Sequence, residues 1–299
     1  MRLLVPVAVV LGTMVAFSWG DNPADAASSQ AVVVPQSGFV EVQGGRLYYE
    51  TAGTGDPIVF IHGNMGDRRH WDHQFQALAK QFRVIRYDVR EYGLSSVVSE
   101  EVAYSDSEDV AALFDHLGVM SAHIVGWSMG SGIAIDFALT HPARTKSLVS
   151  VGPWVSGYSS EAAKRDVFSL IAKIRAAFAE GGRPAAVRVL TDGFAATIRD
   201  PAAGTEFARI AADYSFLSRG QRQSLKPAAV GRLREIRVPT LILTAEHDIP
   251  ACLEVADVLD RSISDSTKIV MAGTGHMLHM ERPKEFNKHL TDFLLRVGR

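Results

Sequence analysis

The stretch AHIVGWSMGSGIAIDFAL, residues 122–139, decides the fold of this 299-residue chain. It opens with a short apolar run typical of a strand, turns at GWSMG (126–130), and continues with small and apolar residues at helical spacing. Glycine on both sides allows a turn too sharp for a Cβ atom, and this turn lifts the hydroxyl of Ser128 clear of a sheet. The pentapeptide alone is common by chance, so its place between a strand and a helix is what predicts a nucleophile elbow.

A serine hydroxyl becomes a nucleophile only when a base takes its proton and a third group orients that base. Two further strand-like runs, 240–245 and 267–271, end in loops that carry Asp248 and His276. The carboxyl ends of parallel strands meet at one edge of an open α/β sheet, where such sheets bind ligands. We therefore predict that Ser128, Asp248 and His276 form a catalytic triad.

Each partner of the serine has an alternative nearby. Glu246 is the alternative acid, and Asp248 is favoured because it lies deeper in the loop, just ahead of a proline that starts a helix. His279 is the alternative base, and His276 is favoured because it directly follows a Gly-Thr-Gly turn. His247 is expected to be a solvated loop residue.

Several segments together resemble the α/β-hydrolase superfamily, in its lipase, esterase and dehalogenase-like branch, from about Gly38 to the C-terminus. VFIHGN (59–64) is similar to the family's third strand and His-Gly-x turn. DVREYGLS (88–95) is similar to its Asp-x-Arg-Gly-x-Gly-x-Ser stretch, and GHMLHMERP (275–283) resembles its C-terminal histidine motif. The departure is Glu91, which stands where the family usually has glycine.

The resemblance implies an oxyanion hole made by the main-chain N–H groups of Asn64 and Met129, which would stabilise charge that develops on the substrate. The side chain of Asn64 is a second candidate donor, and asparagine also favours such a turn. Trp127, Trp154 and Tyr158 are the residues that we expect to bind substrate.

Strands that alternate with helices predict an α/β fold with a doubly wound, mainly parallel sheet. A hairpin about 44–45 is expected to precede it. Between the strand at 147–151 and Pro239 the connection is far longer than usual, which predicts a helical cap inserted at about 153–237.

Three helices are expected in this cap, at Glu161–Glu180, Ala185–Arg199 and Thr205–Phe216. The first has an apolar stripe for which packing against the other cap helices is favoured. The alternative is that the inner apolar side of the cap covers Ser128 and limits the size of the substrate. The stripe consists of Val167, Phe168, Ile171, Ile174 and Phe178.

The N-terminus is typical of a secretory signal peptide at 1–26, with an Ala-x-Ala sequence before Ala27. The hydrolase domain is then 27–299, and the mature protein is secreted or periplasmic without stable membrane contact. An uncleaved membrane anchor is the alternative, because the apolar run of 3–19 is long for a signal peptide.

Composition agrees with a soluble enzyme: 47% of the residues are hydrophobic, 21% are charged, and the formal net charge is −2. Near-neutral charge without basic clusters argues against a nucleic-acid partner. The single cysteine, Cys252, excludes an intrachain disulfide. The cluster HWDH (70–73) offers too few ligands for a closed metal site, so no metal is expected.

Together these features predict a cofactor-free serine hydrolase that cleaves esters of small or medium apolar acids. Lactone opening, C–C bond hydrolysis and perhydrolysis by the same triad are the alternatives. A non-catalytic binding protein on the same fold is a second alternative, and the complete triad argues against it. A dehalogenase is disfavoured because its elbow carries a carboxylate where this chain has Ser128. The sequence leaves the oligomeric state open.

Overall fold

The computed structural model describes residues 33–194, 197–215 and 220–298, and the segment expected to be a signal peptide lies outside them. An eight-stranded sheet forms the centre, in the order β1-β2-β4-β3-β6-β7-β9-β10. Its strands are β1 Gln36–Val42, β2 Gly45–Ala52, β3 Pro57–Ile61, β4 Arg83–Tyr87, β6 Ala122–Trp127, β7 Thr145–Val151, β9 Thr240–His247 and β10 Ser266–Gly275.

The sheet is mainly parallel. From β4 to β10 every neighbouring pair of strands is parallel, whereas β1, β2 and β4 pair antiparallel. The predicted hairpin is present, and Gly44 takes a φ of 75° at its turn. The predicted α/β fold is therefore confirmed, and its central strands read as continuous apolar runs because both faces are covered: Val59, Phe60 and Ile61 are each 0% exposed.

Helices cover the two faces in a way that the strand order dictates. From β3 the chain crosses through α1 (Asp72–Leu78) to β4 on one side, while α2 (Asp106–Leu117) and α3 (Met129–Thr140) lead in the other direction, to β6 and β7. Because such crossovers are right-handed, α1 lies on the face opposite α2 and α3. The direction reverses between β3 and β6, which is the position where open α/β sheets bind ligands.

The remaining core helices follow β9 and β10. They are α6 (Pro250–Ser262), the short α7 (Leu278–Glu281) and α8 (Pro283–Val297), which packs beside α1. Within the described part of the chain, no helix is both long and apolar enough to span a bilayer.

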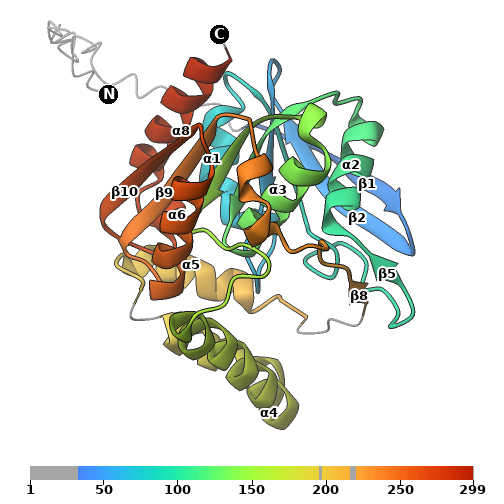
Figure 1. Cartoon of the computed structure of the whole chain (residues 1–299). Coiled ribbons are helices and arrows are strands. Elements are labelled where there is room, and N and C mark those ends of the chain that lie inside the picture. The colour runs from blue at the N-terminus through green and yellow to red at the C-terminus, as the bar shows by residue number, and fades with distance from the viewer. Residues whose placement is uncertain (1–32, 195–196, 216–219, 299) are drawn as a thin grey trace, which may run out of the picture. The chain divides into compact units, whose positions relative to one another are not determined.

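The segment between β7 and β9, residues 152–239, is referred to below as the insertion. It contains a π-helical turn, Ala163–Phe168, followed by α4 (Ser169–Phe194) and α5 (Pro201–Ala211), which lie below the sheet in Figure 1. It returns through β8 (Gln221–Arg222), which pairs in parallel with β5 (Ala103–Tyr104).

The helices of the insertion differ in their bounds from the expected ones. The first two run on as α4 across a break at Gly182, where φ is 67°, and this helix ends at Phe194 rather than at Arg199. The third begins four residues earlier than expected, at Pro201, because the Asp200 carboxylate caps it by accepting from the N–H groups of Ala202 and Ala203 at 2.7 and 3.3 Å.

Candidate active site

Ser128 occupies a strained turn between β6 and α3. Its φ of 54° and ψ of −113° lie where side chains other than glycine are rare. A Cβ atom at Gly126 would lie 2.1 Å from the carbonyl oxygen of Gly130, and one at Gly130 would lie 2.2 Å from that of Ile61. The two glycines are therefore required by close backbone packing, as the pentapeptide predicts.

Asp248 and His276 lie together beyond the ends of β9 and β10. Their side chains form a buried pair, with 2.6 Å between His276 Nδ1 and Asp248 Oδ1. Asp248 also accepts from the N–H of Ile249 at 2.8 Å and from the hydroxyl of Thr244 at 3.1 Å, which fixes its orientation. The alternative acid, Glu246, is half exposed and accepts from the N–H of Gly273 at 2.8 Å.

The two alternative histidines lie elsewhere. His279 is fully buried between the rings of Trp71 and Trp127, with centroid distances of 4.5 and 4.8 Å. Burial lowers the pKa of His279 well below its ordinary value, so its imidazole is neutral. The side chain of His247 is 40% exposed, and its Nε2 lies 3.9 Å from the Glu246 carboxylate.

Trp127 connects the elbow to the histidine loop. Its indole nitrogen donates to the main-chain carbonyl of His276 at 2.9 Å. The same ring packs so closely on the turn after β3 that a Cβ atom at Gly63 would lie 2.4 Å from it. The buried Trp127 side chain therefore contacts three segments of the site and fixes their separation: the elbow after β6, the loop after β10 and the turn after β3.

His62 stabilises the turn that carries Asn64. Its Nε2 accepts from the N–H of Val89 at 2.9 Å, so the proton is on Nδ1, which donates to the carbonyl of Gly63 at 2.7 Å. Burial lowers the pKa of His62 to about 4, which keeps this neutral tautomer at neutral pH.

Tyr92 holds the two candidate oxyanion residues together, a role that the sequence analysis missed. Its hydroxyl donates to Asn64 Oδ1 at 2.6 Å and lies 3.3 Å from the sulfur of Met129. Asn64 Oδ1 also accepts from the N–H of Met65 at 2.9 Å. Met129 is the first residue of α3, where main-chain N–H groups have no acceptor within the helix. The only signal in the sequence was the position of Tyr92 between Asp88 and Ser95.

Ser128 and His276 face the same cavity, which has a volume of about 510 Å³. Trp127, Trp154 and Cys252 also line it, but Tyr158, the third expected pocket residue, is not among the described residues of its wall. The hydroxyl of Tyr158 instead donates to Glu254 on α6 at 2.9 Å, so this ring is fixed outside the cavity.

The insertion supplies most of the apolar wall of this cavity, so the structure agrees with the alternative expected for the first stripe, in which it covers the site, rather than with the favoured packing within the insertion. Val167, Phe168, Ile171 and Ile174 all line the cavity, and Phe178 packs against the core. Leu190, Phe194 and Phe207 complete the same wall from α4 and α5. Val167 and Phe168 belong to the π-helical turn, and Ile171 and Ile174 to α4, so both parts of the insertion contribute to this wall.

One group of possible metal ligands overlaps the site. Among the described residues, only Asp248, Cys252 and His276 bring three ligand atoms within 4.8 Å of one another. Asp248 and His276 already bond to each other, and burial raises the pKa of the Cys252 thiol, which therefore stays protonated. We assign no metal to this group.

The expected weakness of the HWDH cluster as a metal site agrees with its geometry. His70 is buried against Trp127 and Phe207, Asp72 pairs with Arg86, and His73 lies 3.4 Å from Glu206. These side chains point to different neighbours, so they do not form one ligand set.

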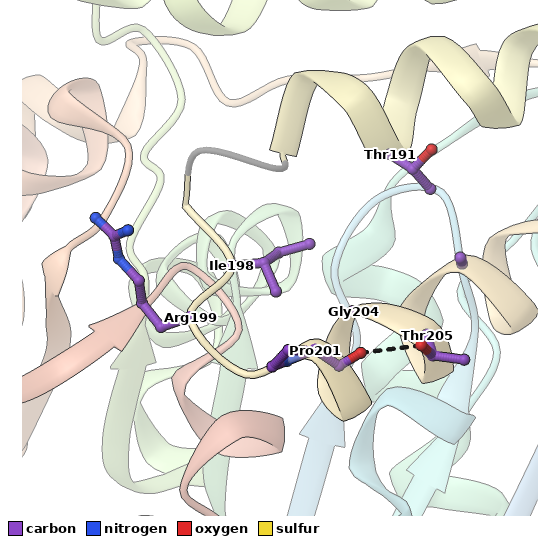
Figure 2. Close-up of a pocket in the computed structure, with 7 residues that line it drawn as sticks. Thr191, Ile198, Arg199, Pro201, Gly204 and Thr205 are labelled. Carbon is purple, nitrogen blue, oxygen red and sulfur yellow. Dashed lines mark hydrogen bonds between the residues drawn. The ribbon is translucent and has the colours of Figure 1, made fainter.

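A second hollow, of about 410 Å³, lies between the end of α4 and the start of α5. Figure 2 shows Thr191, Ile198 and Thr205 around it, with the Thr205 hydroxyl donating to the carbonyl of Pro201 at 2.9 Å. None of the residues that line it belongs to the candidate triad. Ser128 and His276 line the other cavity instead.

The fold and the arrangement of Ser128, Asp248 and His276 define an enzyme of the hydrolase class built on an α/β sheet. The chain belongs to the alpha/beta hydrolase family, whose family model matches residues 58–289. Among its relatives is the 2-hydroxy-6-oxo-6-phenylhexa-2,4-dienoate hydrolase of Comamonas testosteroni. The two are 27% identical over 268 residues, which cover 83% of this chain and 91% of the relative.

Solved structures agree in fold. An esterase from Thermogutta terrifontis superposes with a TM-score of 0.70 at 22% identity, over 88% of this chain and 100% of the esterase. The enol-lactonase from Burkholderia xenovorans LB400 also has a TM-score of 0.70 at 22% identity, over 86% and 100% of the two chains. At this identity the likeness shows the fold, and the reaction must be argued from the site.

Proposed function

We propose that the protein is a serine hydrolase that cleaves carboxylic esters of small or medium apolar acids through an acyl-enzyme on Ser128. The observation that carries this proposal is that Ser128 and His276 line one cavity while His276 Nδ1 is bonded to Asp248. With Nδ1 engaged, Nε2 is the nitrogen that takes the serine proton.

The reaction then follows two acyl-transfer steps. The Ser128 oxygen attacks the ester carbonyl as His276 takes its proton, and the N–H groups of Asn64 and Met129 stabilise the resulting oxyanion. His276 returns the proton to the leaving alcohol as the C–O bond breaks. Water, deprotonated by His276, then attacks the acyl-enzyme and releases the acid.

The apolar wall supports the substrate class. Most of the side chains that the insertion contributes to the cavity of Ser128 are aliphatic or aromatic, with Asp166 and Arg175 among them, and this supports an apolar acyl group. A cavity of about 510 Å³ fits a small or medium acid.

Lactone opening and C–C bond hydrolysis are the rival reactions, and similarity to the Comamonas testosteroni hydrolase and to the enol-lactonase favours testing both. Purified protein should be labelled at Ser128 by a fluorophosphonate probe and then assayed on simple esters, lactones and vinylogous diketones, with and without peroxide. We expect esters to be the best substrates. Absence of labelling would contradict the serine mechanism, and a higher kcat/KM on a lactone or diketone would replace the proposed reaction.

A further inference from the structure

Glu91 has a costly backbone conformation. Its φ of 73° lies in the left-handed region, where a side chain costs about 1–2 kcal/mol. Its side chain is nevertheless buried, with 3% of the residue exposed. In the described chain only Met65 and Ser128 are other non-glycine residues with positive φ, and all three line the catalytic cavity. Residues strained in this way are held by the surrounding structure and cluster at active sites and ligand-binding walls.

The Glu91 carboxylate joins two distant segments. Oε1 accepts from the N–H of Gly220 at 2.7 Å, and Oε2 accepts from the hydroxyl of Tyr104 at 3.3 Å. Tyr104 belongs to β5, and Gly220 immediately precedes β8, the strand by which the insertion returns to the core. Hydrogen bonds to a buried carboxylate are stronger than hydrogen bonds between neutral groups. Glu91 therefore helps to hold Gly220 and β8 against β5.

The residue that donates to Glu91, Gly220, is itself required to be glycine by close packing. A Cβ atom there would lie 2.3 Å from Val98 Cγ2 and 2.8 Å from the Tyr104 ring, so only glycine allows this approach. The strand pair beyond it is short: Gln221 donates to the carbonyl of Val102 and Gln223 to that of Tyr104, each at 2.8 Å. The Glu91 contact acts together with two others on this strand, the bond from the Gln221 side chain to the carbonyl of Glu100 at 3.0 Å and the pair of Arg222 with Asp106.

The fastened strand places Arg222 in the wall of the cavity. Arg222 Nε donates to Asp106 at 3.0 Å, and both residues line the cavity with Asp136 of α3. Asp136 is eight residues beyond Ser128 on a helix that rises 1.5 Å per residue, which places this charged end about 12 Å from the nucleophile.

We propose that Glu91 is a positioning residue that sets the length of substrate the enzyme accepts. It holds Gly220–Gln223 against β5, and through them it keeps Arg222 and Asp106 across the far end of the cavity. Glu91 touches no reacting atom. The inference rests on the proposed ester hydrolysis.

The test compares Glu91→Gly with Glu91→Gln. Glycine removes both hydrogen bonds and relieves the strained φ, so the variant is expected to fold, whereas glutamine keeps an acceptor for the Gly220 N–H. On p-nitrophenyl esters from acetyl to lauroyl, Glu91→Gly should raise kcat/KM for the longest ester relative to the shortest by about tenfold, mainly through KM. The length profile of Glu91→Gln should stay close to that of the wild type.

Gly220→Ala provides an independent variant, because it displaces the same strand while Glu91 is intact, and it should shift the profile in the same direction. Hydrogen exchange of the peptide that contains Gly220–Gln223 should accelerate in both Glu91→Gly and Gly220→Ala. An unchanged length profile despite faster exchange would overturn the proposal, and so would unchanged exchange.

These outcomes are separate from a failure of the proposed function. A wild-type protein that is neither labelled at Ser128 nor active on any ester would refute ester hydrolysis. Two measurements would still test whether Glu91 limits the length of the cavity. One is the rate of hydrogen exchange. The other is the binding of N-alkyl amides of increasing length, compared between Ser128→Ala and the double variant that also carries Glu91→Gly. Equal binding by the two proteins at every length would overturn it.

Discussion

The indole of Trp127, the residue before the candidate nucleophile, donates to the main-chain carbonyl of His276. This bond joins the end of β6 to the loop after β10 and fixes the histidine backbone relative to Ser128. Because the position of His276 depends on Trp127 and Asp248 rather than on the serine, removing the serine hydroxyl leaves the rest of the site in place.

The first prediction concerns Ser128 and His276. Ser128→Ala and His276→Ala should each lower kcat on a good ester by at least about a thousandfold, and the double variant should be hardly worse, because the residues act as a unit. Circular dichroism and thermal unfolding should show an intact fold in both. A single variant that retains most of the activity would exclude that residue from the triad.

The second prediction distinguishes the two acids. Asp248→Asn keeps the size of the side chain but favours the wrong tautomer of His276, so kcat should fall by about 10⁴. Glu246→Gln should change kcat by less than about threefold, because exposed groups away from the reacting atoms contribute little. Measurement of kcat for the two variants distinguishes the acids. A large loss in Glu246→Gln with a small loss in Asp248→Asn would make Glu246 the acid of the triad.

The third prediction uses Trp154, which lines the cavity, and Tyr158, which does not. Trp154→Ala removes a wall and should shift preference toward bulkier acyl groups by roughly 1–3 kcal/mol in relative kcat/KM. Tyr158→Phe is the matched control: it deletes only the bond to Glu254 and should leave the acyl profile unchanged. Equal profiles for wild type and Trp154→Ala would show that this ring does not limit the acyl group.

The fourth prediction concerns pH and stability. The ring nitrogens of His70 are buried and lack polar partners in the described structure, and burial lowers the pKa of His70 to about 3. On unfolding its pKa returns to about 6.5, so between about pH 6.5 and 3 the unfolded state binds a proton that the folded state excludes. Relative to His70→Phe, the wild type should therefore lose about 1.4 kcal/mol of unfolding free energy for each pH unit below 6.5.

Urea unfolding of both proteins at several pH values tests this. Asp88 and Asp136, whose pKa values burial raises to about 6, titrate in the opposite sense but are present in both proteins, so their effect cancels in the difference. A difference that does not vary with pH would mean that His70 is protonated in the folded state.

The fifth prediction concerns export. We expect the mature protein to begin at Ala27 when the full chain is expressed with a secretion system, and N-terminal sequencing of the exported form tests this. A chain that keeps Met1 and sediments with membranes would support the anchor instead.

The strands and the three candidate catalytic residues were predictable because their signals are local. Each strand is an apolar run closed by turn residues, and Ser128, Asp248 and His276 each follow such a run. The start of α5 was also predictable from the sequence, because Asp200 followed by Pro201 is typical of a helix N-terminus.

The contacts of Glu91, Tyr92 and Tyr158 were not predictable in the same way. Glu91 meets Gly220 across 129 positions of the chain, and Tyr158 meets Glu254 across 96. Neither pair has a spacing or a composition that marks it in the sequence. The orientation of the apolar stripe of α4 likewise depends on how the insertion packs on the core. No local sequence pattern specifies that packing.

The three strained residues of the cavity wall, Met65, Glu91 and Ser128, have a consequence for adaptation. Glycine at any of them would relieve about 1–2 kcal/mol of backbone strain, offset in part by the greater freedom of glycine in the unfolded chain. At Met65 and Glu91 glycine would also remove a buried apolar side chain and two hydrogen bonds, so relief of strain favours glycine only at Ser128. Selection for heat resistance alone would therefore act first against the candidate nucleophile, where stability and the proposed reaction make opposite demands.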